Sequence, residues 1–357
     1  MATDTTLLVA SVRNEGPNIL EWVAHHRLCG FDRIQVHVSE STDTTLKTLR
    51  ILDRLGVVEL LDVRGDAGDP HMRTFRRASR SEAYRDATWC MTLGCDEFLT
   101  IRTEAGTVQS LIAACPEDAT TILVSSRVFG SGAERDLSGM LTTERFTQAE
   151  PADAVKEDPL PFKTLFRTAA YGRPGVHMPR DARAEDEVIC NASGLLENGF
   201  HRKNWRATDP GGRRFAQINH YRLRDLSSFL LTDGQPRKDS DPFETWVQFD
   251  RNEEEDQTLA ARAFDTWAEM KRLDTLANGR LLRLRERARQ QWAQSLETLL
   301  ASPEVTALAD RIKSAAPARP MQTPFKLPGH AEPIFVSVRA RQAEDVQAPE
   351  ERKAASG

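Results

Sequence analysis

The string Gly94-Cys95-Asp96-Glu97 places two adjacent carboxylates directly after residues 88–93, which read as a buried strand. Carboxylate oxygens bind hard divalent cations, and such a cation can also hold phosphate oxygens. An Asp-Glu pair at a strand exit also forms turns and helix caps, so the pair alone does not define a site. The chemistry of this turn therefore depends on what lies beside it.

Polar side chains also follow the first two expected strands. Asn14 and Glu15 stand in the first of these loops, and Glu40 and Asp43 stand in the second. A nucleotide base and ribose need hydrogen-bonding groups of this kind, while a diphosphate needs a cation or arginines. The three loops together predict a nucleotide cleft. The alternative is that they are ordinary polar loops, in which Thr42 or Asp43 serves only to cap the next helix.

Strands that alternate with helices position these loops. We expect strands at residues 6–12, 34–38, 57–63 and 88–93, with helical stretches between them. This alternation predicts an α/β fold with a Rossmann-like, mostly parallel sheet that is flanked by helices. Ligands of such sheets bind outside the carboxyl ends of the strands, which is where the three loops are expected to meet.

The regular alternation stops after Phe98, although residues 121–128 and 163–167 predict further strands. From about Asp241 the chain becomes helical and charged, and an expected packing face there carries Trp246, Phe249, Phe264 and Trp267. The last segment is rich in proline and charge, as is typical of a tail. We therefore expect an α/β nucleotide-binding domain at 1–235, a helical extension at 236–314 and a disordered tail at 315–357.

Composition and missing motifs exclude several classes of protein. The chain has 48 Lys and Arg against 53 Asp and Glu, a net charge of −5, which gives no electrostatic reason to expect nucleic-acid binding. No apolar stretch approaches the roughly 18–20 residues of a membrane span, and the start lacks the pattern of a secretory signal, so we expect a cytoplasmic protein. Sequence signatures of dehydrogenases, phosphate-loop NTPases, zinc proteases and serine esterases are absent from the chain.

An ordered set of short motifs resembles the family 2-like glycosyltransferases of bacterial surface-polysaccharide loci. The set comprises Arg13-Asn14-Glu15-Gly16-Pro17, Ser41-Thr42-Asp43, Gly68-Asp69-Pro70, Asp96-Glu97-Phe98-Leu99, Glu144-Arg145-Phe146 and Asn219-His220-Tyr221. The resemblance covers residues 5–235. It implies a GT-A fold, a nucleoside-diphosphate sugar as donor, and Mn²⁺ or Mg²⁺ held by an Asp-x-Asp motif.

The resemblance also implies roles for individual residues. Asn14 and Glu15 match the family's first nucleotide-binding loop, and Asp43 matches the acid of its second loop. Asp96 matches the last Asp of Asp-x-Asp, which contacts the metal. Gly94 stands where the family has the first Asp, which helps to hold the ribose and the water shell of the metal. This departure predicts either altered metal and donor binding or an inactive relative.

Sugar transfer also needs a base that deprotonates the acceptor hydroxyl while a cation stabilises the leaving diphosphate. Glu144 is the first candidate for the base, although it could equally pair with Arg145 or a neighbouring strand. Asp186 and Asp209 are weaker alternatives.

Histidine and arginine side chains could complete the site. His220 is the first candidate to join Asp96 as a metal ligand, and His177 is the second. Arg73 is the arginine nearest the loop on a basic helix face that also carries Arg76, Arg77 and Arg80. Arg73 could bind a donor phosphate, and a solvated basic face is the alternative.

The sequence thus predicts a metal-assisted, inverting, hexosyltransferase-like glycosyltransferase of polysaccharide biosynthesis. Its partners would be a nucleotide-sugar and a saccharide or lipid-linked acceptor, with peripheral membrane contact left open. The alternative is a catalytically inactive nucleotide-sugar-binding or scaffold protein, in which Gly94 marks a degenerate Asp-x-Asp motif.

Overall fold

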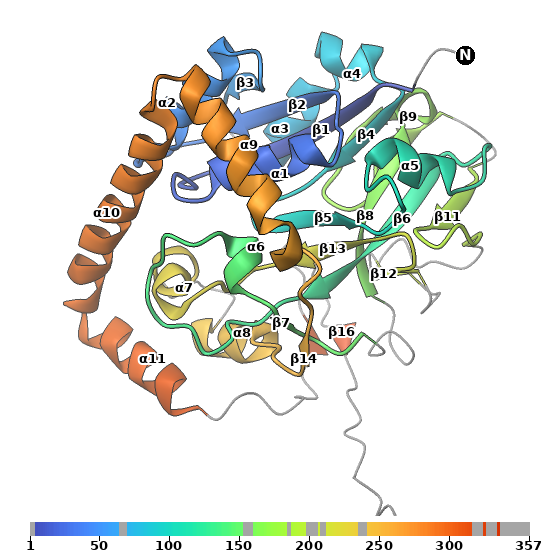
Figure 1. Cartoon of the computed structure of the whole chain (residues 1–357). Coiled ribbons are helices and arrows are strands. Elements are labelled where there is room, and N and C mark those ends of the chain that lie inside the picture. The colour runs from blue at the N-terminus through green and yellow to red at the C-terminus, as the bar shows by residue number, and fades with distance from the viewer. Residues whose placement is uncertain are drawn as a thin grey trace, which may run out of the picture. The chain divides into compact units, whose positions relative to one another are not determined.

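A ten-stranded sheet forms the centre of the computed structural model (Figure 1), which describes residues 4–63, 70–152, 160–183, 187–197, 206–207, 212–234, 241–315, 324–325 and 334–335. Eight strands follow one another in the order β3 (Glu59–Asp62), β2 (Arg33–Val38), β1 (Thr6–Val12), β4 (Trp89–Thr92), β8 (Leu160–Arg167), β6 (Thr121–Val128), β13 (Ala216–His220) and β5 (Glu97–Ile101). Two short strands lie off this path: β11 (Ile189–Asn191) pairs with β6, and β12 (Arg206–Ala207) pairs with β8.

The strands β3, β2, β1 and β4 are parallel to one another, as the alternating sequence predicts. The second half of the sheet is mixed, because β8 runs antiparallel to both of its neighbours and β5 runs antiparallel to β13. The expected α/β fold with a mostly parallel, helix-flanked sheet is confirmed. The structure also corrects two details. Glu97 begins a fifth strand instead of ending a loop, and the strand that carries His220 continues through that residue.

Helices cover both faces of the sheet, which explains why β1 is apolar at nearly every position. Leu8 packs in the larger core cluster with residues of α1 (Ile19–Leu28), whereas Leu7 and Val9 pack with Ala78 and Tyr84 on the other side. The remaining helices of this part are α2 (Thr45–Arg54), α3 (Pro70–Ala78), α4 (Glu82–Asp86), α5 (Val108–Ala113) and α6 (Thr142–Arg145). Burial on both faces fixes the sheet rigidly, so the loops at its carboxyl edge have defined positions.

The charged C-terminal part of the chain is helical, as expected. It contains α7 (Leu226–Thr232), α8 (Pro242–Phe249), α9 (Ala263–Leu276), α10 (Arg280–Leu300) and α11 (Pro303–Ser314). In Figure 1, α9 crosses α1, and α10 runs from beside α2 past α7 to α11. Met270 and Leu273 of α9 are fully buried, but Phe264 is 81% exposed and does not belong to the packing face on which we expected it.

Smaller elements complete the structure. Strand β7 (Gln148–Ala149) pairs with β14 (Glu254–Glu255), and β9 (Tyr171–Arg173) pairs with β10 (Arg180–Ala182). The chain divides into two compact units, Met1–Ala318 and Arg319–Gly357, and the second contains the antiparallel pair β15 (Pro324–Phe325) and β16 (Ile334–Phe335). The domain boundaries expected at residues 235 and 314 stay a prediction. No helix among the described residues is long and apolar enough to cross a membrane.

Candidate active site

The two adjacent acids of the Gly94–Glu97 turn have different surroundings. Glu97 is buried, and its Oε2 accepts a hydrogen bond from the Gly94 N–H at 2.7 Å and lies 2.9 Å from Lys163 Nζ. The backbone oxygen of Glu97 accepts from Trp22 Nε1 at 3.0 Å. Glu97 therefore holds the turn in place, and Asp96 is the acid that remains at the edge of the site, with 34% of its side chain exposed.

Asp96 faces His220, the last residue of β13. Its Oδ2 lies 3.2 Å from His220 Nε2, and its backbone oxygen accepts a hydrogen bond from the Tyr221 N–H at 2.8 Å. Burial disfavours the charged form of Asp96, but His220 and the positive charges of Arg224 and Arg222 outweigh that effect, so the pKa of Asp96 lies well below its usual value. Asp96 is therefore a carboxylate at neutral pH. The structure brings together the two residues that the sequence predicts as metal ligands.

Arg224 connects the Asp96 turn to the first loop of the fold. Its Nη2 lies 3.2 Å from Glu15 Oε2 and donates to the Cys95 backbone oxygen at 3.3 Å. Its backbone has a φ of 55°, a conformation that costs a residue with a Cβ about 1–3 kcal/mol unless its surroundings hold it there. Burial, together with the charge of Asp96, raises the pKa of Glu15, and Arg224 opposes this shift. The first loop and the Asp96 turn therefore meet at one edge of the sheet.

Asn14 and Asp43 hold the first two loops to each other. Asn14 Oδ1 accepts from the Thr42 N–H at 2.8 Å, and its backbone has a φ of 53°, which asparagine tolerates better than most residues. Asp43 Oδ2 accepts from the Gly16 N–H at 2.8 Å, while Oδ1 accepts from the Thr45 N–H at 2.9 Å in the first turn of α2. Asp43, which precedes the N-cap residue Thr44, thus binds both the first loop and the first residue of α2. Its binding to a nucleotide stays a prediction.

Glu40 of the second loop lies near Arg73 of α3. Arg73 Nη2 is 4.0 Å from Glu40 Oε2, and the guanidinium is mostly buried while the carboxylate is exposed. Arg73 belongs to α3, and residues 68 and 69 of the neighbouring Gly-Asp-Pro motif lie outside the described residues. The structure thus brings together two of the predicted nucleotide contacts, and their role in binding stays a prediction.

Glu144, the predicted base, contacts the start of its own helix and α9. It lies in the short helix α6, where its Oε2 is 3.5 Å from both the Leu141 N–H and Trp267 Nε1 of α9. Within the described part of the chain, none of its recorded hydrogen bonds or ion pairs reaches Asp96, His220 or Glu15. Its two alternatives, Asp186 and Asp209, lie outside the described residues. The identity of the base stays a prediction without structural support.

His177, the second candidate ligand, hydrogen-bonds to the backbone of β8. Its Nδ1 is 2.9 Å from the Phe162 backbone oxygen, and burial, with a further contribution from Lys163, lowers its pKa to about 4. His177 is therefore neutral at pH 7. Its position favours a role in packing over the ligand role that the sequence considered second.

The described residues offer a metal ion few protein ligands. Nowhere in these ranges are three or more His, Cys, Asp or Glu side chains grouped so as to hold a metal. Asp96 and His220 provide one carboxylate oxygen and one imidazole nitrogen that face each other, a donor pair that suits Mn²⁺ better than Mg²⁺, because Mg²⁺ prefers oxygen ligands. A Cβ added to Gly94 would lie 2.5 Å from Asp96 Oδ1, so an acid at position 94 is incompatible with this placement of Asp96.

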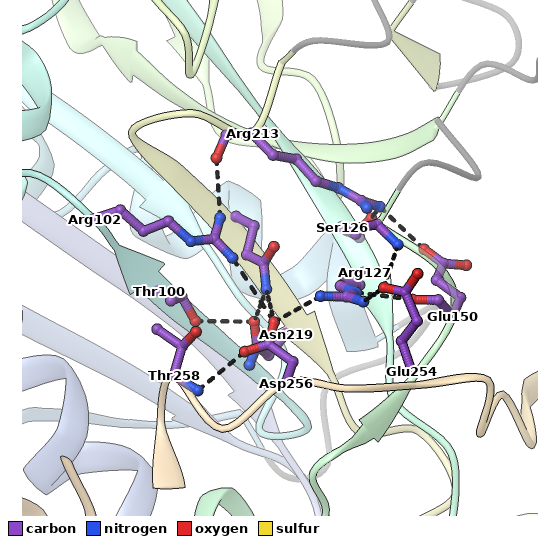
Figure 2. Close-up of polar contacts among 12 residues, drawn as sticks. Thr100, Arg102, Ser126, Arg127, Glu150, Arg213, Asn219, Glu254, Asp256 and Thr258 are labelled. Atoms are coloured by element: carbon purple, nitrogen blue, oxygen red, sulfur yellow. Dashed lines mark hydrogen bonds and ion pairs between the residues drawn. The ribbon is translucent and has the colours of Figure 1, made fainter. Parts of the chain in front are cut away.

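A buried polar network fixes the strand that carries His220 (Figure 2). On β13, Gln217 and Asn219 point to the face opposite His220, because side chains alternate along a strand. Asn219 Oδ1 accepts from Gln217 Nε2 at 2.7 Å and from Thr100 Oγ1 of β5 at 2.9 Å. Gln217 Nε2 also donates to Asp256 Oδ2 at 3.1 Å.

Arg127 of β6 joins this network to the C-terminal part of the chain (Figure 2). Its Nη1 is 2.9 Å from Asp256 Oδ2, and its Nη2 is 2.7 Å from Glu254 Oε2. The guanidinium is almost completely buried. A buried arginine is stable only when paired, so these contacts tie the 254–256 segment firmly to the sheet.

Sequence reasoning missed Arg224 and the whole network. The residues Arg222-Leu223-Arg224, which alternate directly after Asn219-His220-Tyr221, were an available signal for a basic group at that strand end. The network offered no such signal, because its members come from four separate segments of the chain.

A match to a protein-family model identifies the class of protein to which this chain belongs. The model of glycosyltransferase family 92 matches residues 12–262, and the chain belongs to that family. The expected likeness to glycosyltransferases is thus confirmed, although the matching family is 92 and not 2. No curated protein matches the chain.

Among solved structures, the chain is similar to Staphylococcus aureus TarS. TarS is 14% identical, with 46% of this chain and 29% of that chain covered and a TM-score of 0.30. Its 1–349 fragment in complex with UDP-GlcNAc is 13% identical, with 86% of this chain and 83% of the fragment covered and a TM-score of 0.35. The same fragment in complex with UDP is 14% identical, with 46% of this chain and 47% of the fragment covered and a TM-score of 0.32. The chain thus spans less than a third of the first of these proteins.

Proposed function

We propose that this chain transfers a sugar, with inversion, from a nucleoside-diphosphate donor to a hydroxyl of a saccharide or lipid-linked acceptor. The family match supports the class of reaction. The observation that carries the proposal is the Asp96–His220 pair, which Arg224 joins to the first loop through Glu15. Paired acid and imidazole at the carboxyl edge of an α/β sheet lie where such folds bind their ligands.

The chain's own residues supply most of what donor binding needs. Asp96 and His220 would hold a divalent cation, which on binding would neutralise charge on the leaving diphosphate. Arg224 keeps Glu15 and the Asp96 turn together, so the first loop and the metal ligands have a fixed relative position. Asn14 and Asp43 keep the second loop against the first. A preformed edge of this kind lowers the entropic cost of orienting the donor.

The test is nucleotide release. Purified protein is incubated with a panel of UDP- and GDP-sugars, Mn²⁺ and candidate acceptors, and the freed nucleotide is measured. We expect release with at least one donor, and a drop of about tenfold or more in Asp96→Ala because a direct metal ligand is removed. Asp310→Asn, an exposed acid of α11, is the matched control and should leave release unchanged.

Two outcomes would contradict the proposal. Release that is absent with every donor would favour a catalytically silent nucleotide-sugar-binding or scaffold protein. Release that is equal in Asp96→Ala and in the parent would place the chemistry away from this edge.

A further inference from the structure

Residues 139–143 lie between a buried carboxylate and a buried guanidinium. Glu21 of α1 accepts hydrogen bonds from the Thr142 N–H at 2.8 Å and the Thr143 N–H at 3.0 Å. Arg285 of α10 donates from Nη1 to the Gly139 backbone oxygen at 2.9 Å and from Nη2 to the Met140 backbone oxygen at 3.0 Å. Glu21 is 1% exposed and Arg285 is 8% exposed. The backbone oxygens of residues 139 and 140 therefore bind a buried cation, and the backbone N–H groups of residues 142 and 143 bind a buried anion.

The two buried charges depend on each other. Burial alone lowers the pKa of Arg285, and the negative charge of Glu21 opposes that shift. Burial raises the pKa of Glu21, and the two backbone N–H groups together with Arg285 oppose it. Burying one charge without the other would be costly, because an unpaired ion loses its hydration without compensation. The pair thus favours one arrangement of α1, α10 and the segment between them.

Arg285 also holds the first loop of the candidate site. Its Nε donates to the Pro17 backbone oxygen at 3.0 Å, just before α1. Close by, a Cβ on Gly16 would lie 2.7 Å from the Ala288 Cβ of α10, so the loop and the helix are in direct contact. Thr44 Oγ1 donates to the Leu284 backbone oxygen at 3.0 Å, which fastens the start of α2 to the same helix. Leu284, Arg285 and Ala288 of α10 thus contact both predicted nucleotide loops.

A small cavity connects these contacts to Arg224. Its lining includes Pro17 and Asn18 of the first loop, Met140 and Thr142 of the 139–143 segment, and Arg224. Asn18 Nδ2 and Arg224 both contact Glu15 Oε2, at 2.8 and 3.2 Å. A displacement of Pro17 would therefore reach Glu15 and Arg224, and through Arg224 the Asp96 turn.

The residues that match the family model end at 262, so Arg285 lies outside them. We propose that Arg285 is a positioning residue of the donor site, and that α10 is a built-in part of that site. This inference rests on the proposed function. Arg285 touches no substrate; it acts by fixing Pro17 and residues 139–140 with one planar fork of donors. A lysine could reach one of these carbonyls but could not reproduce the fork.

The test compares Arg285→Met and Arg285→Lys with Arg287→Met, an exposed arginine of the same helix. Amide hydrogen exchange is measured on the nucleotide-free protein. We expect faster exchange at residues 12–18 and 137–146 in Arg285→Met, an intermediate change in Arg285→Lys, and none in Arg287→Met. Equal exchange in all four proteins would overturn the proposal.

A second readout separates positioning from general stability. Calorimetry with UDP and Mn²⁺ should show about tenfold weaker binding in Arg285→Met, which corresponds to about 1.4 kcal/mol. With an active donor, KM should rise more than kcat falls, because the bound donor itself re-forms the loop. A fall in kcat with unchanged KM and unchanged UDP affinity would contradict the proposal.

A milder variant covers the case in which Arg285→Met does not fold. Thr44→Val keeps the shape of the side chain and removes its bond to the Leu284 oxygen, so it should loosen residues 12–18 in the same direction but by less. Unchanged exchange in both Thr44→Val and Arg285→Lys would overturn the proposal. If the parent protein fails to bind UDP or any other nucleotide, the proposed function fails, while the exchange data still decide whether α10 positions the loop.

Discussion

Asp96 and His220 are 124 residues apart in the chain, yet their carboxylate and imidazole lie 3.2 Å apart at the carboxyl edge of the sheet. The contact follows from strand pairing, because His220 stands opposite Glu97 in the antiparallel pair of β13 and β5. Asp96, one residue before Glu97, therefore reaches the imidazole across the strand end. The geometry makes this pair the centre of the predictions that follow.

Replacing Asp96 by Asn should remove the charge of the proposed metal ligand and keep its size. We expect UDP binding that depends on Mn²⁺ in the parent and that weakens about tenfold or more in Asp96→Asn, as is typical for loss of a ligand or its close support. Calorimetry with and without a chelator measures this. Equal UDP affinity in chelator and in Mn²⁺ would contradict a metal-assisted site, and Asp310→Asn serves as the control for a lost surface charge.

Restoring the missing acid at position 94 should lower activity instead of raising it. The new Cβ would lie 2.5 Å from Asp96 Oδ1 and 3.4 Å from Glu97 Oε2, so the Asp96 carboxylate would have to shift from its present position beside His220. We expect reduced nucleotide release in Gly94→Asp and a comparable reduction in Gly94→Ala, because the obstacle is steric. If Gly94→Asp is more active than the parent while Gly94→Ala is not, the added charge matters more than the clash.

The first half of the fold could be predicted from sequence because its elements are local. The apolar runs at β1, β2 and β4 and the helices between them are consecutive, and a parallel sheet follows from their alternation. The meeting of the first two loops with the Asp96 turn also follows, since carboxyl ends of parallel strands share one edge. The antiparallel insertion of β8 does not follow, because it depends on pairings between distant segments.

The candidate site was predictable only where one residue type suffices to suggest its role. Asp96 and His220 are of residue types that commonly bind metals, so their proposed role can be suggested from the sequence alone. Arg285 does not, because its role arises from three backbone oxygens that lie about 145 to 270 residues away in the chain. Glu144 shows a different limit: its local motif suggests a base, but the motif does not reveal the contact of its side chain with Trp267 of α9, and its role stays a prediction.

Removing Arg127 should destabilise the protein strongly. Arg127→Met would remove the nearer cation from the buried Asp256 and leave it Arg102 at 3.8 Å together with its hydrogen bonds from Gln217 and Thr258. Loss of one partner of a buried ion pair costs about 3–5 kcal/mol. Urea unfolding measures this cost. Lys313→Met, at an exposed pair on α11, should change the free energy of unfolding by about 0.5 kcal/mol or less. Similar losses in both variants would show that the network in Figure 2 is not a stabilising one.

The protein should lose stability as the pH falls from about 6.5 towards 4, the window set by histidine titration. Burial lowers the pKa of His25 to about 4 and that of His37 to about 3. In this window the unfolded chain binds protons that the folded protein does not, so the free energy of unfolding decreases as the pH decreases. Each such histidine contributes up to about 1.4 kcal/mol per pH unit.

His37→Gln tests this dependence at a single residue. His37 is fully buried and its Nε2 lies 3.0 Å from Gln35 Oε1 of the same strand. Between pH 6.5 and 4, we expect this variant to lose a slope of unfolding free energy against pH that corresponds to the uptake of about one proton, or about 1.4 kcal/mol per pH unit. Urea unfolding at several pH values measures the slope. Arg287→Met removes no group that titrates in this window, so this variant should keep the slope of the parent protein. An unchanged slope in His37→Gln would mean that folding does not lower the pKa of His37.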